Sequence, residues 1–122
     1  MSESAILKRI MLACSRGAVR MFRNNCGALQ DKNGQWVRYG VANPGGSDLI
    51  GWRTVTVTPE MVGARLAVFV AVEVKDKGRA TDAQLSFIQA VRTAGGIAGV
   101  ARSEEAALAI LQTMPGDTVH TE

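Results

Sequence analysis

The 122-residue chain is long enough for one domain, and its 47% hydrophobic and 20% charged residues are typical of a globular protein with a core rather than of a disordered segment. Its net charge of +3 permits an anionic partner but does not by itself indicate one. The single histidine, His120, lies in a polar C-terminal tail, which argues against a histidine-based zinc site and a Ser-His-Asp triad. No apolar run approaches the roughly 20 residues of a membrane span and no secretory signal is visible, so we expect no membrane association.

The two cysteines, Cys14 and Cys26, do not have the spacing of metal ligands. Cys14 lies on the apolar stripe of a predicted helix, which favours a buried free thiol. We therefore expect a reduced, intracellular setting.

The first half of the chain begins with a predicted helix over residues 2–15. Its apolar residues recur on one helical face, and Ser2 or Ser4 can cap it. Residues 18–23 and 35–39 are strand-like, and the turn residues between them include Asn33-Gly34, a strong hairpin signal. A loop rich in glycine then leads into a predicted strand over residues 49–58.

The second half alternates strands and helices. Residues 65–74 are apolar and rich in β-branched side chains, which predicts a central strand covered on both faces. After a charged loop, Thr81 can cap a helix over residues 82–93 that Gly95-Gly96 can end. The residues expected to face the core in this half include Leu85, Ile88, Val91, Leu108 and Leu111.

The remaining elements are a short strand over residues 97–101 and a last helix capped by Ser103. No repeat, low-complexity segment or internal linker interrupts the chain. We therefore predict a single α/β domain over residues 1–122.

The end of the predicted strand over residues 65–74 carries a carboxylate and an ammonium two positions apart. Side chains alternate across a strand, so Glu73 and Lys75 are expected on the same face. Either charge alone would be costly to bury. An ordinary ion pair at a partly exposed strand end explains the pattern, and a catalytic pair explains it as well.

Asp48 favours the catalytic interpretation. It follows a Gly-Gly-Ser loop and opens the preceding strand, so its carboxylate can lie beside Glu73 if the two strands pair. Two neighbouring carboxylates repel each other when both are ionised, unless a cation lies between them. Oxygen ligands suit Mg²⁺ or Mn²⁺ rather than zinc. Taken alone, Asp48 would be explained as a turn residue or strand-start cap.

Gln84 adds a third element to this set. It is the third helical residue after Thr81, where its side chain can close a capping box. It also lies on the helix that follows the Glu73 and Lys75 strand end, where its amide can orient a water molecule or a phosphate. Both roles can hold together.

These segments, in this order, resemble a known nuclease family over nearly the whole chain. The segments that carry the resemblance are Glu3, residues 22–27, Gly-Gly-Ser-Asp-Leu-Ile-Gly at 45–51, Val-Glu-Val-Lys at 72–75, residues 78–88 with their Thr-x-x-Gln pattern, and residues 95–98. They resemble the PD-(D/E)xK nuclease superfamily and, within it, the VRR-NUC (virus-type replication-repair nuclease) branch. Ser47 stands where the superfamily's name expects proline, but the acid is present as Asp48. The resemblance implies a restriction-endonuclease-like domain with a central mixed β-sheet flanked by helices.

The resemblance also implies a site and its chemistry. Asp48 and Glu73 would ligate Mg²⁺ or Mn²⁺, and the backbone carbonyl of Val74 would complete the protein ligands. Lys75 would hold or help to deprotonate the attacking water and offset developing negative charge. Gln84 would position the water or a phosphate oxygen.

Residues at the edge of this site are less distinctive. Glu3 matches the family's helix-one acid and could lie just beyond the direct metal ligands, although an acid at the positive end of the helix dipole explains it nearly as well. Trp52 could stack on a base, but an aromatic side chain on a strand more often belongs to the core. The basic residues that could neutralise DNA phosphates, or could simply be solvated surface charges, are Lys77, Arg79, Arg23 and Arg53.

The function that follows from the resemblance is that of a metal-dependent, structure-specific DNA endonuclease. Stand-alone members of the branch resemble Holliday-junction resolvases, and a four-way junction is cut on two strands related by symmetry, so we expect a homodimer. No nucleotide cofactor is expected, because no Gly-Lys-Ser/Thr follows Gly45-Gly46. We expect an intracellular, cytoplasmic protein, and the family's name allows a phage or prophage origin.

Two other functions stay open. A flap or single-strand-specific repair nuclease would use the same chemistry, and its oligomeric state would distinguish it. A non-catalytic nucleic-acid-binding module with a nuclease-like fold would be expected to have lost at least one of Asp48, Glu73, Lys75 and Gln84, and all four are present.

Overall fold

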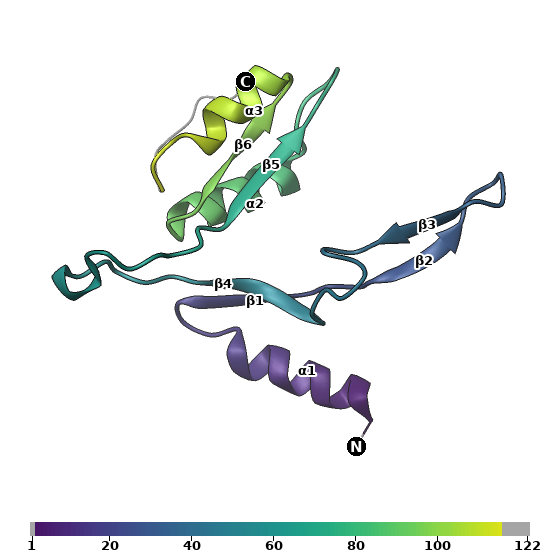
Figure 1. Cartoon of the computed structure of the whole chain (residues 1–122), viewed down its shortest axis with the longest axis horizontal. Helices are drawn as coiled ribbons and strands as arrows, with labels where there is room; N and C mark the ends of the chain where they lie inside the picture. The colour runs from purple at the N-terminus through teal and green to yellow at the C-terminus, as the bar shows by residue number, and fades with distance from the viewer. Residues whose placement is uncertain (1, 116–122) are drawn as a thin grey trace. The chain divides into compact units, whose positions relative to one another are not determined.

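A computed structural model describes residues 2–115 of the chain (Figure 1). Its elements are α1 (Glu3–Cys14), β1 (Val19–Arg23), β2 (Gly27–Gln30), β3 (Trp36–Tyr39), β4 (Leu49–Arg53), the 3₁₀ turn η1 (Pro59–Met61), β5 (Val70–Val74), α2 (Asp82–Thr93), β6 (Ile97–Ala101) and α3 (Glu104–Leu111). The mixture of helices and strands confirms the α/β class. The chain divides into two compact units, Met1–Val55 and Thr56–Glu122, and each is described by itself. His120 lies outside the described residues, and no helix within residues 2–115 is long and apolar enough to cross a membrane.

The first unit combines α1 with two antiparallel strand pairs. The Ser2 hydroxyl begins α1 by accepting a hydrogen bond from the Ala5 backbone N–H at 3.1 Å, as the sequence predicts. β1 pairs with β4 over its whole length, with Met21 opposite Gly51. β2 pairs with β3 as a hairpin.

The turn of this hairpin is closed by the side chain of Asp31. Its carboxylate accepts hydrogen bonds from the backbone N–H groups of Asn33 and Gln35, at 2.8 Å and 2.9 Å. The hairpin signal at Asn33-Gly34 is thus confirmed. The strand that precedes the turn is β2, which the sequence analysis does not predict, because Gly-Ala-Leu-Gln contains no β-branched residue.

The second unit is built around the parallel pair β5 and β6, which α2 connects. The register runs from Val70 opposite Ile97 to Val74 opposite Ala101. All five residues of β6 are buried. Gly96 lets the chain turn tightly from α2 into β6, since a Cβ at this position would come within 2.8 Å of the Phe69 carbonyl oxygen.

The two helices of this unit pack on opposite faces of the β5–β6 pair and cover β6 completely but β5 only in part. Ile97, Ala101 and the α3 residue Ile110 form a buried cluster, and Val72 packs against it. Ala71 and Glu73 point to the other face, where they line a pocket with residues of α2. The strand that is covered on both faces is therefore β6.

The structure corrects several predictions about the strands. The strand predicted over residues 49–58 ends at Arg53, and the one predicted over 65–74 begins only at Val70. β5 is not covered on both faces, because Val70 and Val74 at its ends are 47% and 74% exposed. The strands of residues 2–115 form three two-stranded sheets, where the resemblance implies one central sheet. The strand and helix predicted at residues 97–101 and 82–93 are confirmed.

Some predicted core positions are also wrong. Cys14 is exposed, because Leu7 is the buried residue of α1. In α2, Ile88 and Val91 are buried as predicted, whereas Leu85 is 40% exposed. In α3, Leu108 and Leu111 are exposed, since the helix turns Ile110 toward β6 instead.

Candidate active site

Glu73 and Lys75 lie together at the carboxyl end of β5, as strand alternation predicts. The Lys75 Nζ is 3.6 Å from Glu73 Oε2. The Lys75 and Glu73 side chains are 21% and 29% exposed, so both charges keep some contact with solvent. The Lys75 backbone N–H continues the pairing with β6 by donating to the Ala101 carbonyl at 3.1 Å. The backbone of Lys75 is thus held by β6, and the neighbouring Glu73 carboxylate remains accessible to a ligand.

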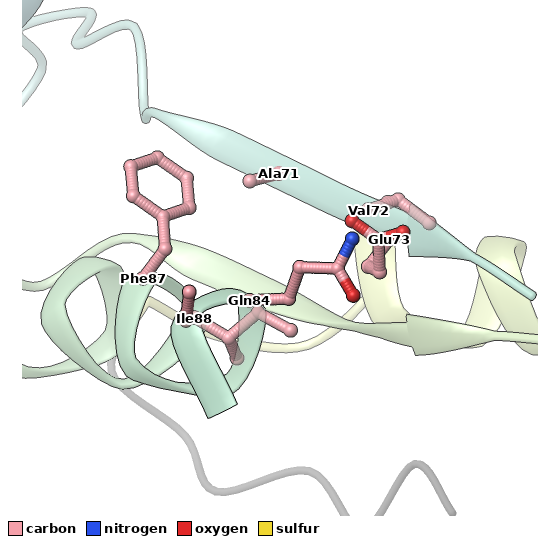
Figure 2. Close-up of a pocket in the computed structure, with 7 residues that line it drawn as sticks. Ala71, Val72, Glu73, Gln84, Phe87 and Ile88 are labelled. Atoms are coloured by element: carbon pink, nitrogen blue, oxygen red, sulfur yellow. The ribbon is translucent and has the colours of Figure 1, made fainter. Parts of the chain in front are cut away.

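Gln84 is held at the start of α2 by a reciprocal capping box. Its backbone N–H donates to Thr81 Oγ1 at 3.1 Å, and its side-chain Oε1 accepts from the Thr81 backbone N–H at 2.9 Å. Since Oε1 is engaged by Thr81, the NH₂ group is the end that turns toward the Glu73 carboxylate (Figure 2). The capping role of Gln84 is confirmed, and the same geometry presents a hydrogen-bond donor beside Glu73.

A pocket of about 330 Å³ lies between β5 and α2. Glu73 and Gln84 supply its polar groups, and Figure 2 shows Ala71, Phe87 and Ile88 along the rest of the wall. An apolar wall reduces the screening of charges in the pocket, which strengthens the field of Glu73 on a bound cation. The second unit therefore brings together three of the predicted site residues.

Asp48 belongs to the first unit, where it lies at a bend directly before β4. Its side chain is exposed, and its backbone carbonyl accepts a hydrogen bond from the Asn24 N–H at 2.8 Å. Within either unit, the described residues contain no group of three or more His, Cys, Asp or Glu side chains placed to bind a metal ion. Asp48 and Glu73 are thus placed by separate parts of the fold.

Asn24 is a residue of this region that the sequence analysis misses. Asn24 is a polar residue but is buried, with only 7% of its surface exposed. Its side chain donates hydrogen bonds to the backbone of the loop that leads to Asp48. Its position in a polar run gives no periodic signal, since its partners lie 17 and 23 residues away.

The loop after β5 carries Lys77 and Arg79, both exposed. Arg102, just after β6, donates from its guanidinium to the carbonyl oxygens of Asp76 and Gly78, at 3.3 Å and 2.7 Å. This contact, which the sequence analysis also misses, holds the loop that presents the two cations next to Lys75.

The other predicted edge residues lie in the first unit. Arg23 and Arg53 are exposed, and because Arg23 pairs with Leu49 and Arg53 with Val19, they stand at opposite ends of the β1–β4 ribbon. Glu3 is exposed in the first turn of α1. Trp52 is half-buried, and its ring lies 5.4 Å from that of Phe22, which fits a packing role.

A comparison with protein families places the chain. The family model described as VRR-NUC domain matches residues 5–105, a stretch that contains Asp48, Glu73, Lys75 and Gln84 but begins after Glu3. Neither the curated proteins nor the solved structures give a match to the chain. Family membership implies a hydrolase that acts on DNA. The chain belongs to the VRR-NUC domain family and is a nuclease of the PD-(D/E)xK type.

Proposed function

We propose that the protein is a Mg²⁺- or Mn²⁺-dependent, structure-specific DNA endonuclease that resolves four-way junctions as a homodimer. The observation that carries the catalytic part is the set at the end of β5, where the Glu73 carboxylate lies 3.6 Å from the Lys75 ammonium and lines a pocket together with the amide of Gln84. The donor set fits a hard divalent cation, because Asp48 and Glu73 offer carboxylate oxygens.

In this mechanism, the carboxylates of Asp48 and Glu73 and the backbone carbonyl of Val74 would hold the ion, and Glu3 would act from outside this set of direct ligands. When bound, the ion supplies positive charge and Lewis acidity at the scissile phosphate. Lys75 offsets the negative charge that develops on the phosphate and orients the attacking water, a role that its place 3.6 Å from Glu73 supports.

Gln84 donates from its NH₂ group to the attacking water or to a phosphate oxygen. Its capping bonds to Thr81 fix the amide before substrate arrives, so little entropy is lost on ordering it.

The DNA backbone is contacted by Lys77 and Arg79 beside the site and by Arg23 and Arg53 on the β1–β4 ribbon. All four side chains are exposed, which suits contacts that neutralise phosphates without reading bases. Recognition then depends on the shape of the DNA.

The homodimer follows from the substrate, because the two cuts in a four-way junction are related by a two-fold axis. Trp36 in the β2–β3 hairpin is 70% exposed, and the other residues of β3 are exposed as well, which makes this hairpin our candidate for the dimer surface. A cytoplasmic setting is supported by the free thiols of Cys14 and Cys26.

The proposal is tested by cleavage of an end-labelled four-way junction with Mg²⁺ or Mn²⁺, beside linear duplex, flap and single-stranded DNA. The Glu73→Ala variant and a matched Glu105→Ala control, which changes an exposed glutamate of α3, are assayed together. We expect symmetric paired nicks that require the metal and Glu73, and that the control retains. Analytical ultracentrifugation should show a dimer at the assay concentration.

Other outcomes would decide against parts of this proposal. Preferential cutting of flaps or single strands would keep the site and exclude the resolvase function. A monomer would exclude paired cutting. Cleavage that does not need a divalent metal ion, or no cleavage by folded protein that binds DNA, would exclude the proposed catalytic site.

A further inference from the structure

We propose that Asn24 is a positioning residue for Asp48, fixing the loop that presents this carboxylate to a divalent ion. The inference rests on the proposed function, in which Asp48 is a metal ligand. It depends on the first unit alone, where all of the contacts involved lie.

The Asn24 side chain ties together both ends of the loop before β4. Its Nδ2 donates to the Val41 carbonyl at 2.9 Å and to the Ser47 carbonyl at 3.1 Å. Its Oδ1 accepts from the Val41 backbone N–H at 2.8 Å. Its own backbone N–H donates to the Asp48 carbonyl at 2.8 Å. Asn24, directly after β1, thus holds Val41 at the start of the loop and both Ser47 and Asp48 at its end.

Asn24 holds the two ends of this loop, whereas Asn43 holds its middle by donating to the Gly27 and Tyr39 carbonyls. Residues 41–48 contain no strand or helix, and they include two glycines, which have the greatest conformational freedom. At 7% exposure, the Asn24 amide makes its bonds out of competition with water, where a lost partner is costly. Gly46 packs against this amide, and a Cβ there would collide with the Val41 carbonyl oxygen.

Asparagine is the residue type that the arrangement requires. The carbonyl oxygens of Val41 and Ser47 need a donor, which the side-chain NH₂ group supplies, and the Val41 backbone N–H needs an acceptor, which the side-chain oxygen supplies. Aspartate has nearly the same shape but would turn an oxygen toward the two carbonyls. Asn24→Asp therefore loosens the loop with almost no change of volume.

The experiment measures Mn²⁺ binding by isothermal titration calorimetry for the full-length wild type, Asn24→Asp and Asn33→Asp. Asn33 is an exposed asparagine of the hairpin turn in the same unit, so its variant adds the same charge away from the loop. We expect Asn24→Asp to weaken Mn²⁺ binding by about tenfold or more, which is typical when a residue that orients a ligand is changed. Asn33→Asp should bind as the wild type does. Hydrogen exchange of residues 41–47 should accelerate in Asn24→Asp but not in the control.

A double-mutant cycle separates positioning from a general structural role. In an Asp48→Asn background, which lacks the carboxylate, Asn24→Asp should weaken Mn²⁺ binding no further. It should still lower thermal stability, because the hydrogen bonds of Asn24 do not involve the Asp48 side chain. If Asn24→Asp fails to fold, Gly46→Ala replaces it, because it disturbs the same loop from the opposite side. The same loss of Mn²⁺ affinity is then expected.

The outcomes distinguish this inference from the proposed function. Mn²⁺ binding that depends on Asp48 but is unchanged in Asn24→Asp, with a loosened loop, overturns the positioning role alone. Mn²⁺ binding that is absent from the wild type, or independent of Asp48, overturns the metal site and the inference together.

Discussion

Replacing Glu73 with the isosteric glutamine should remove activity while leaving the fold nearly as stable as before. At 3.6 Å the attraction between Glu73 and Lys75 is about 1 kcal/mol at the dielectric constant of water, and about 4–5 kcal/mol at an effective constant of about 20. Solvent screening of these partly exposed groups and the entropy of ordering two long side chains reduce the net contribution to about 1 kcal/mol or less. For a chain of this size, that corresponds to a fall in melting temperature of about 5 °C at most.

In the proposed mechanism Glu73 is a metal ligand, and the loss of such a carboxylate removes several kcal/mol of transition-state stabilisation. The cleavage rate of Glu73→Gln should therefore fall by about 10²-fold or more. Circular dichroism melting and single-turnover cleavage of the junction measure the two effects on the same preparation. A fall in melting temperature above about 10 °C would mean that the pair is structural and that unfolding accounts for lost activity. Cleavage at the wild-type rate would refute the role of the carboxylate itself.

Three further predictions concern the core, the start of α2 and the hairpin. Ile110→Ala should lower the free energy of unfolding by about 2–5 kcal/mol in urea titrations, because Ile110 is 1% exposed. Leu108, at 58% exposure, is the control, and its replacement by alanine should lower the free energy of unfolding far less. Equal losses of stability would contradict the assigned core. Thr81→Ala should destabilise the protein by about 1 kcal/mol and slow cleavage, because it removes the oxygen that binds the Gln84 N–H, and Thr81→Ser should restore both. Trp36→Lys should shift sedimentation toward the monomer and leave single nicks in place of paired ones; an unchanged dimer would exclude the hairpin as the interface.

The sequence predicts best those features that depend on near neighbours in the chain. The starts of α2 and α3 are predicted correctly, and Ser2 is one of the two caps predicted for α1. Ser2, Thr81 and Ser103 each accept a hydrogen bond from a backbone N–H three residues on, a contact between near neighbours in the chain. The common face of Glu73 and Lys75 follows from strand alternation, and the ion pair confirms it.

Features that depend on distant contacts are predicted less well. The short helix α3 is apolar over most of its surface, so periodicity does not select Ile110 over Leu108, and packing against Ile97 and Ala101 decides it. The apolar run over residues 65–74 likewise does not show where pairing begins, because this is decided by β6, whose first residue, Ile97, lies opposite Val70. Asn24 is missed for the same reason, since its partners are brought near only by folding.

The capping box of α2 carries information that its sequence pattern alone does not. Either glutamate or glutamine can accept the Thr81 N–H, so helix formation is indifferent between them. Beside Glu73, however, glutamate would place a second negative charge, and glutamine places a donor (Figure 2). The amide at position 84 is therefore explained by the neighbouring Glu73 carboxylate and not by the requirements of the helix cap. If Gln84 acts in cleavage as proposed, a screen for folding should accept both residues and a screen for cleavage should distinguish them.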